Sequence, residues 1–537
     1  MRTECFAVRK FVCLAVLVTI LSFLSLTSGS LFGQETGGAI GGTLKDASGA
    51  VVVGARVTIT NKSTGRIFAA TTGSNGTYTV RQLEPGRYSV RFDMSGFAPV
   101  EVADAELLLG KTVKVDASLQ VAPVEQAVTV IETVPLVDLS STTVGHNVTS
   151  EEFGGLPKAR SFQGLFRASP SVTSGVDQFG NIVGIEGGFQ VNGASSAENQ
   201  YNIDGVSTTS LINGRSRQNA VSEFIQEVQV KTGGIEAEYG GAMGGVLSAV
   251  TKSGGNAFHG DVHYYLGGNK LSAVPIQRLL LDPVGERNVS FVQDDKQGDD
   301  RHEFGGSIGG YFIKNKLWFF AGISPQWRRR SNDYQFSSGA EQGTLKVKRL
   351  DQNVFGKVSF DPFTRMRTNF TYLWTPTFST GRPPAYNSGP NQTTSSKASN
   401  EITKQIGFFQ PQTSYTGTID LLLGNKMILT VKAGRFWDNY KDTGIPGISA
   451  VEYRTSTSSL TPALLATVPA NQQGPILFGN TPRFRQVFKD IVARTYIQAD
   501  YGIFGNLWGD HDLKLGIGTM KNVNDVNDGY PDRKSVV

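Results

Sequence analysis

From about residue 257 onward, apolar and polar side chains alternate with a period of two residues. Met366, Phe370 and Trp374 fall on one side of a strand, and Arg367 and Asn369 fall on the other. Successive side chains of a strand point to opposite faces, so antiparallel β-structure is predicted here. A β-sandwich would also alternate, but charges in the middle of long strands and aromatic residues toward their ends indicate lipid on one face and water on the other. We therefore expect 257–537 to be a transmembrane antiparallel β-barrel.

The connections support this expectation. Tight links at 314–316, 361–364 and 424–425 separate long polar segments, which are listed here as predicted loops: 267–302, 329–350, 376–411 and 440–490. Outer-membrane barrels have short turns on one side and long loops on the other. About nine strands are predicted between Phe258 and Thr519. Large outer-membrane transporters have about 22 strands, so an incomplete, C-terminally truncated barrel is expected.

The first 33 residues have the features of an export signal. Arg9 and Lys10 precede an apolar run at 11–26, and small residues follow, with cleavage expected after Ser30 or Gly33. An uncleaved membrane anchor is the alternative, but the run is shorter than the roughly 20 residues that a spanning helix needs. Both cysteines lie within this segment, so the mature chain can form neither a disulfide framework nor a zinc–thiolate cluster.

Residues 36–121 are predicted to form a small β-sandwich. Short alternating strands at 55–60, 77–80 and 87–92 are separated by turn pairs such as Asn75-Gly76 and Pro85-Gly86. This arrangement resembles the carboxypeptidase regulatory-like domain, which has a transthyretin-like fold. The resemblance implies an accessory or binding module and no peptidase activity.

The segment 122–256 carries two glycine turns in series and then a glycine-dense stretch between two apolar strands, 224–230 and 246–250. In this order they resemble the α+β plug domain of Oar-like TonB-dependent outer-membrane receptors. Asn-Gly stands where many siderophore receptors carry Arg-Gly, which argues against a siderophore ligand. The residues matching the plug signature are Asn192, Gly193, Asp204, Gly205, Gly240, Gly245 and Thr251.

The resemblance implies a Gram-negative outer-membrane receptor, embedded in outer-membrane lipid, that takes up a large ligand into the periplasm through coupling to the protein TonB. Val128, Thr129 and Val130 are the predicted TonB contact, because strand addition requires main-chain hydrogen bonds and little sequence. A strand that merely joins two domains is an equal alternative. An oligosaccharide or a peptide is the expected ligand class, and no cofactor is expected.

Other functions were weighed against this one. No P-loop or catalytic motif is found, so an enzyme is not predicted, and scattered lysines and arginines argue against nucleic acid. His259 and His263 flank Asp261 on one strand face, where lumen polarity explains them better than a metal does. The run 328–330 is interpreted as a solvated or headgroup-contacting rim, and the acids at 294–300 as a solvated loop rather than a calcium site. A secreted or surface carbohydrate-binding or adhesion protein is the principal rival, and an enzyme-associated accessory subunit is the second.

Overall fold

The computed structural model describes residues 37–529 except for a set of short internal segments. These are 122–127, 134–142, 156–159, 175–187, 212–213, 237–238, 241, 275, 282–288, 294–295, 297, 337–341, 382–393, 396–405, 425–426, 445–451, 454–460, 468–477, 480–485 and 507–509. The predicted export signal lies outside the described residues. No helix in the described part of the chain is long and apolar enough to cross a membrane.

The N-terminal module is the predicted β-sandwich. One sheet contains β1 (Gly38–Asp46), β4 (Thr77–Leu83), β7 (Thr112–Lys114) and β8 (Ala117–Leu119). The other has the order β3 (Ile67–Thr71), β2 (Arg56–Asn61), β5 (Gly86–Asp93), β6 (Val100–Leu107) and β9 (Val128–Thr133). Alternate residues of both sheets face inward, and Tyr78 meets Phe92 edge-on with ring centroids 5.4 Å apart.

The plug is built on a five-stranded sheet. Its order is β10 (Val144–Thr149), β15 (Ile225–Gly233), β16 (Val246–Thr251), β13 (Gln200–Ile203) and β14 (Val206–Ser207). Around it lie α2 (Ser150–Gly154), η1 (Phe162–Ala168), η3 (Ser196–Glu198), η4 (Ser222–Phe224) and the pair β11 (Val172–Ser174) and β12 (Phe189–Val191). Phe162, Phe166 and Tyr201 are buried in its core, which continues into the wall through the stacked rings of Phe224 and Phe355.

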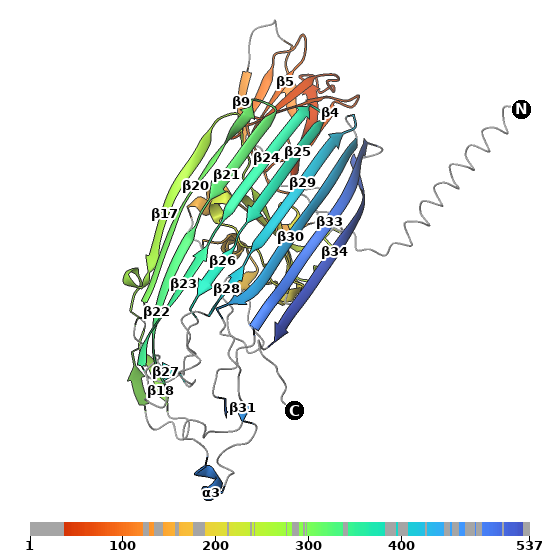
Figure 1. The fold of residues 1–537 in the computed structure, drawn as a ribbon. Coiled ribbons are helices and arrows are strands. Elements are labelled where there is room, and N and C mark those ends of the chain that lie inside the picture. Colours follow the sequence, from red (N-terminus) through yellow and green to blue (C-terminus); the bar gives the residue numbers. More distant parts are fainter. Residues whose placement is uncertain are drawn as a thin grey trace, which may run out of the picture.

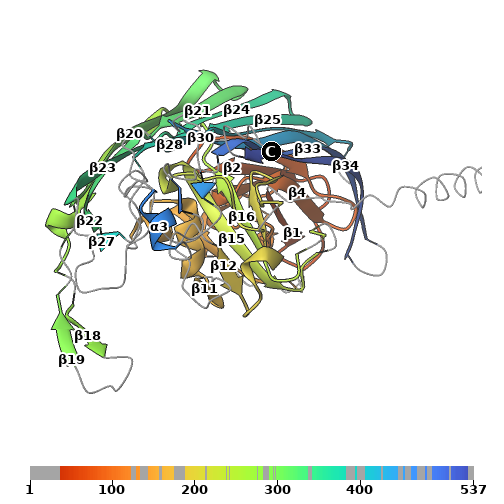
Figure 2. The same ribbon diagram turned by 60° about the horizontal axis from the view of Figure 1, so that its bottom comes forward.

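A single large antiparallel sheet, here called the wall, curves around one side of the plug (Figure 2). Its unbroken strands are β17 (His259–Gly268), β20 (Gly298–Ile313), β30 (Met427–Thr443), β33 (Gln486–Asn506) and β34 (Asp510–Gly529). Four further strands are each split in two: β21 (Leu317–Ile323) with β22 (Gln326–Phe336), β24 (Val354–Phe363) with β23 (Gln342–Asp351), β25 (Met366–Trp374) with β26 (Thr377–Thr380), and β29 (Gln412–Leu422) with β28 (Gly407–Gln410). The wall thus has nine long strands, and among the described residues β17 and β34 each pair on one side only.

The splits lie at one level. Pro325, Pro376 and Pro411 interrupt three of these four strands there, and Gln352 and Asn353 interrupt the one that lies between the strands of Pro325 and Pro376. Proline lacks the N–H that a ladder bond requires. The carbonyl of each proline still accepts a bond from a neighbouring strand, for example from the N–H of Gln352 to Pro376 at 3.0 Å. We call this level the break line.

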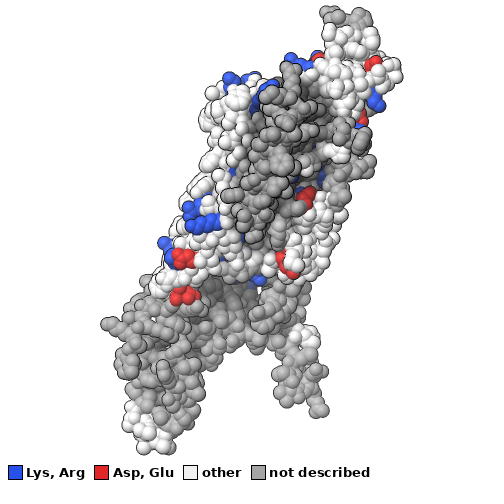
Figure 3. Space-filling view, turned by 90° about the vertical axis from the view of Figure 1, so that its right-hand side faces the viewer, with Lys and Arg blue, Asp and Glu red and all other residues white. Residues whose placement is uncertain are grey.

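The wall reverses the usual distribution of polarity. Ile517, Leu515 and Phe370 point outward, with Ile517 58% exposed, whereas Asp420 and Thr416 on the opposite face are buried. A water-soluble sandwich would bury the apolar face. The predicted lipid-facing and lumen-facing sides are therefore confirmed. In Figure 3, charged side chains occupy only a small part of the described surface seen from the β34 side.

The two ends of the wall differ (Figure 1). The tight turns, with the sandwich against them, lie at one end, and the long connections lie at the other. One loop prediction was wrong: most of 329–350 belongs to β22 and β23, which pair from Gln326 to Gln335. Polarity on both faces suggested a loop, but a strand that extends beyond the lipid is wetted on both sides.

Candidate functional site: the plug and its anchors

The two predicted glycine turns of the plug are tight reversals. Asp204 and Gly205 join β13 to β14 as a two-residue hairpin loop, with φ of 46° and 81°. Asn192 and Gly193 adopt the same left-handed conformations, with φ of 53° and 81°. Paired positive φ angles favour Asn-Gly and Asp-Gly, which explains these residue types.

The signature residues are partly brought together. The Asp204 carboxylate accepts bonds from the Thr251 N–H at 2.9 Å and the Thr251 hydroxyl at 2.5 Å. Gly245 lies where a Cβ would be 2.8 Å from a Val191 methyl carbon, so only glycine fits without a shift. Gly240 lies apart, half-buried in the glycine-dense turn. These contacts give most signature residues a role in holding the plug together, while their role in function stays a prediction.

Arg160 forms the first anchor between plug and wall. Its guanidinium donates to both oxygens of Glu223 in the plug, each at 2.6 Å, and to Glu303 in β20 at 2.7 and 3.1 Å. It also stacks on the ring of Tyr265, 3.7 Å from the centroid. Burial would raise the pKa of Glu223, but bonding and attraction from Arg160 lower it to about 2. The plug is thus tied to the lumen face by a charged, largely desolvated cluster.

Arg217 forms the second anchor, to strands farther along the wall. It pairs with Asp438 of β30 at 2.6 Å and with Asp490 of β33 at 3.4 Å. Its carbonyl accepts a bond from the Gln412 side chain at the break line. Nearby, Arg494 donates to the carbonyl and hydroxyl oxygens of Ser207.

The sandwich is fixed to the tight-turn end of the wall. The buried Arg66 donates two bonds to Asp361, at 2.9 and 3.0 Å, lies 3.4 Å from Glu84, and stacks over Trp318 at 4.6 Å. Burial opposes ionisation of Glu84, but Arg66 and then Lys357 lower its pKa. The module therefore lies across this end of the wall rather than hanging free.

The predicted TonB segment lies at a sheet edge. The backbone of β9 pairs in parallel with β6, Val128 opposite Val100, Thr129 opposite Glu101 and Val130 opposite Val102. This is the geometry of the domain-joining strand kept as the alternative. The opposite edge of β9 has no strand partner among the described residues.

The histidine pair does not come together as a metal site. His263 bonds Asp261 at 3.0 Å and Ser324 at 3.1 Å, whereas His259 bonds the Ala257 carbonyl. A different set, Glu223, His263 and Glu303, has ligand atoms within 4.8 Å of one another. Arg160 already donates hydrogen bonds to both carboxylates, so their proximity is accounted for by the first anchor.

Sequence reasoning missed the anchors. Neither Arg160 nor Arg217 belongs to the glycine turns, strands or signature residues by which the plug was predicted. Glu303 and Asp438 could have been noticed in the sequence, because each is an acidic residue on the lumen face of a long strand. Nothing in one sequence shows which plug cation meets them.

Comparison with known families gives three consecutive matches. Residues 39–120 match the carboxypeptidase regulatory-like domain, 137–246 the TonB-dependent receptor plug domain, and 250–469 an outer membrane beta barrel domain. The chain belongs to the TonB-dependent outer-membrane receptors with a regulatory-like N-terminal domain. This family is non-enzymatic and resides in the Gram-negative outer membrane, as predicted.

The chain is also similar to individual relatives. It is 32% identical over 289 residues to the TonB-dependent transporter Oar of Myxococcus xanthus, covering 52% of this chain and 25% of Oar. The outer membrane transporter YddB of Escherichia coli superimposes with a TM-score of 0.44 at 14% identity, covering 72% of this chain and 57% of YddB. The siderophore receptor PirA of Acinetobacter baumannii gives 0.44 at 14%, covering 70% and 48%. The chain thus spans a quarter of Oar and about half of each structural relative.

Proposed function

We propose that this chain acts in energy-coupled uptake of a large ligand into the periplasm, with TonB displacing the plug. The observation that carries the proposal is the way the plug is held. Two arginine-centred anchors join it to a polar lumen face, so a pull that breaks a few charged contacts frees a path along that face. The apolar outer face argues against the secreted carbohydrate-binding alternative, because it would be left in water.

The TonB contact is proposed at Val128, Thr129 and Val130. The free edge of β9 offers main-chain donors and acceptors to an added strand, which is how extended peptides bind sheet edges. An oligosaccharide or peptide remains the proposed ligand class, on the basis of the long connections opposite the sandwich. The module boundaries near 121 and 256 are likewise proposals.

The experiment measures binding of the purified chain, in detergent micelles, to the purified periplasmic domain of TonB. Thr129→Pro removes one backbone N–H and should abolish binding, whereas Thr129→Val keeps the strand and should bind like the parent. Equal binding by both variants would place the contact elsewhere. No binding by the folded parent chain would overturn TonB coupling of this chain.

A further inference from the structure

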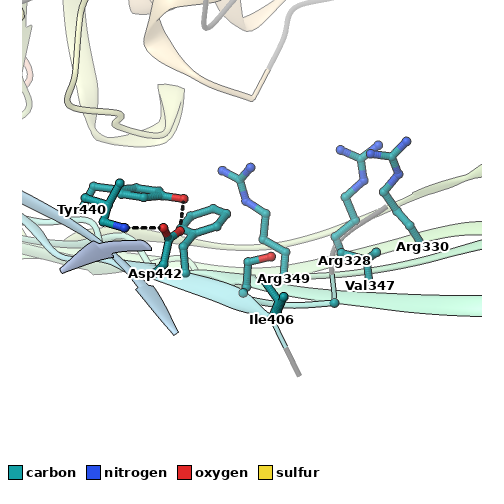
Figure 4. Close-up of a pocket in the computed structure, with 12 residues that line it drawn as sticks. Arg328, Arg330, Val347, Arg349, Ile406, Tyr440 and Asp442 are labelled. Carbon is teal, nitrogen blue, oxygen red and sulfur yellow. Dashed lines mark hydrogen bonds between the residues drawn. The ribbon is translucent and has the colours of Figure 1, made fainter. Parts of the chain in front are cut away.

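A cavity of about 420 Å³ opens on the lumen face of the wall, on the long-connection side of the break line. Its volume lies within the roughly 300–1,000 Å³ typical of small-molecule sites. Six wall strands line it, β22, β23, β26, β28, β30 and β33. Figure 4 shows Arg328, Arg330 and Arg349 extending their guanidinium groups from the sheet on the same side.

Strand register explains the gathering of these arginines. Arg301, Arg328 and Arg349 are direct cross-strand neighbours on β20, β22 and β23, and Arg330 follows Arg328 on the same face. Like charges directly opposite each other destabilise a sheet. Asp299, directly opposite Arg330, attracts Arg328, Arg330 and Arg301, so it offsets part of this repulsion.

Carboxylates hold part of this row in place. Asp299 accepts two bonds from Arg328, at 2.6 and 2.8 Å, and Asp351 accepts the Nε–H of Arg349 at 2.8 and 2.9 Å. Both of these Arg349 bonds use Nε–H, so the two terminal nitrogens of its guanidinium can face the cavity that this residue lines. The Arg330 side chain lies opposite Asp299, which attracts it, but it donates no hydrogen bond to any residue that the structure describes.

The other side of the cavity is aromatic and apolar. Phe408, Tyr440 and Ile406 line it, and the Tyr440 hydroxyl donates to Asp442 at 2.9 Å. Asp442 also accepts the Val487 N–H at 2.7 Å, so each of its carboxylate oxygens has a hydrogen-bond donor within the wall. The cavity therefore pairs a guanidinium side with an apolar side.

We propose that this cavity binds an organic anion whose carboxylate or phosphate group meets Arg330 and Arg349 and whose adjoining aromatic or aliphatic group packs against Phe408 and Ile406. Guanidinium forks match carboxylate and phosphate oxygens in geometry and charge. The inference rests on the proposed uptake function and narrows its ligand to one with an anionic, partly apolar end. The sequence analysis interpreted all three arginines of 328–330 as one solvated or headgroup-contacting rim. In the structure the alternation of the strand turns Arg329 outward, away from this cavity, and Arg328 and Arg330 toward it.

The test is equilibrium binding to the full chain in detergent micelles, with N-acetylphenylalanine, its uncharged amide, phenyl phosphate and inorganic phosphate as probes. The carboxylate and phenyl phosphate should bind, with affinity falling as salt rises, and the amide should not. Arg330→Gln should weaken binding about 10- to 100-fold, the effect of one lost charge-assisted bond. Arg329→Gln, the outward-facing control, should bind like the parent.

Equal binding of acid and amide, an Arg330→Gln variant that binds like the parent, or no binding of any probe by the folded chain would each overturn the proposal. Preference for phenyl phosphate over N-acetylphenylalanine, or the reverse, identifies the anionic group. Binding of inorganic phosphate as tightly as phenyl phosphate would refute the apolar half of the site. The assay contains no TonB, so its failure is separate from a failure of TonB coupling.

Discussion

Replacing Arg160 by alanine should loosen the plug from the wall. The change removes four charge-assisted hydrogen bonds and leaves Glu303, 1% exposed, with an uncompensated charge. Removing one partner of a buried ion pair costs about 3–5 kcal/mol. Glu303 keeps donors from Ser324 and Gln326, and Glu223 keeps one from Tyr265, so we expect about 3 kcal/mol, the low end of that range.

The assay is hydrogen exchange of plug amides in detergent micelles. A loss of about 3 kcal/mol should speed exchange in β13, β15 and β16 about 100-fold, provided that they exchange through release of the plug. Arg167→Ala, at an exposed arginine in the same part of the plug, is the matched control. Adding Glu303→Gln to Arg160→Ala should recover part of the protection, because it removes the stranded charge.

The same anchor has a pH signature. The pKa of Glu223 in the folded protein is about 2, below its usual 4.5. A lowered carboxyl pKa adds stability that is present above pH 4.5 and is lost as pH falls toward 2. The reasoning is refuted if Arg160→Ala changes plug exchange no more than Arg167→Ala does at neutral pH.

Two further predictions concern the plug. Burial raises the pKa of Glu227 to about 7, although the Asn147 side chain and the Leu109 N–H both donate hydrogen bonds to its carboxylate. Stability of the folded chain should therefore fall as pH rises from 4.5 through 7. Glu227→Gln should abolish this pH dependence in unfolding measured at pH 5 and pH 8, and an unchanged dependence would contradict the prediction. Gly245→Ala should destabilise the plug by about 1–3 kcal/mol through overpacking, whereas Gly154→Ala, with open space around its Cβ position, should not; equal exchange rates in the two variants would exclude the steric explanation.

The local rules of the chain predicted its strands well. Alternation at 366–374 placed the lipid and lumen faces correctly, because side-chain direction follows from residue parity alone. Asn192-Gly193 and Asp204-Gly205 were predicted as turns because two consecutive positive φ angles leave few residue choices. These features depend on neighbours within a few positions.

The anchors depend instead on contacts between residues far apart in the chain. Arg160 and Glu303 are separated by 143 positions, and many other acids lie on the lumen face. The arginine row was missed for a similar reason. Residues 328–330 were visible as a run, but the register that sets Arg301, Arg328 and Arg349 side by side is a property of three paired strands.

The break line has a mechanical consequence. Three of its four neighbouring split strands carry a proline, which has no N–H, at the same height, so fewer ladder bonds stiffen the wall there. Two acids of the anchors accept hydrogen bonds from side chains at this height: Glu303 from Ser324, and Asp438 from Gln410. We therefore expect the wall to bend along this line. A tilt of its outer half would then move the acids of the first and second anchors, while the turns beside the sandwich stay in place.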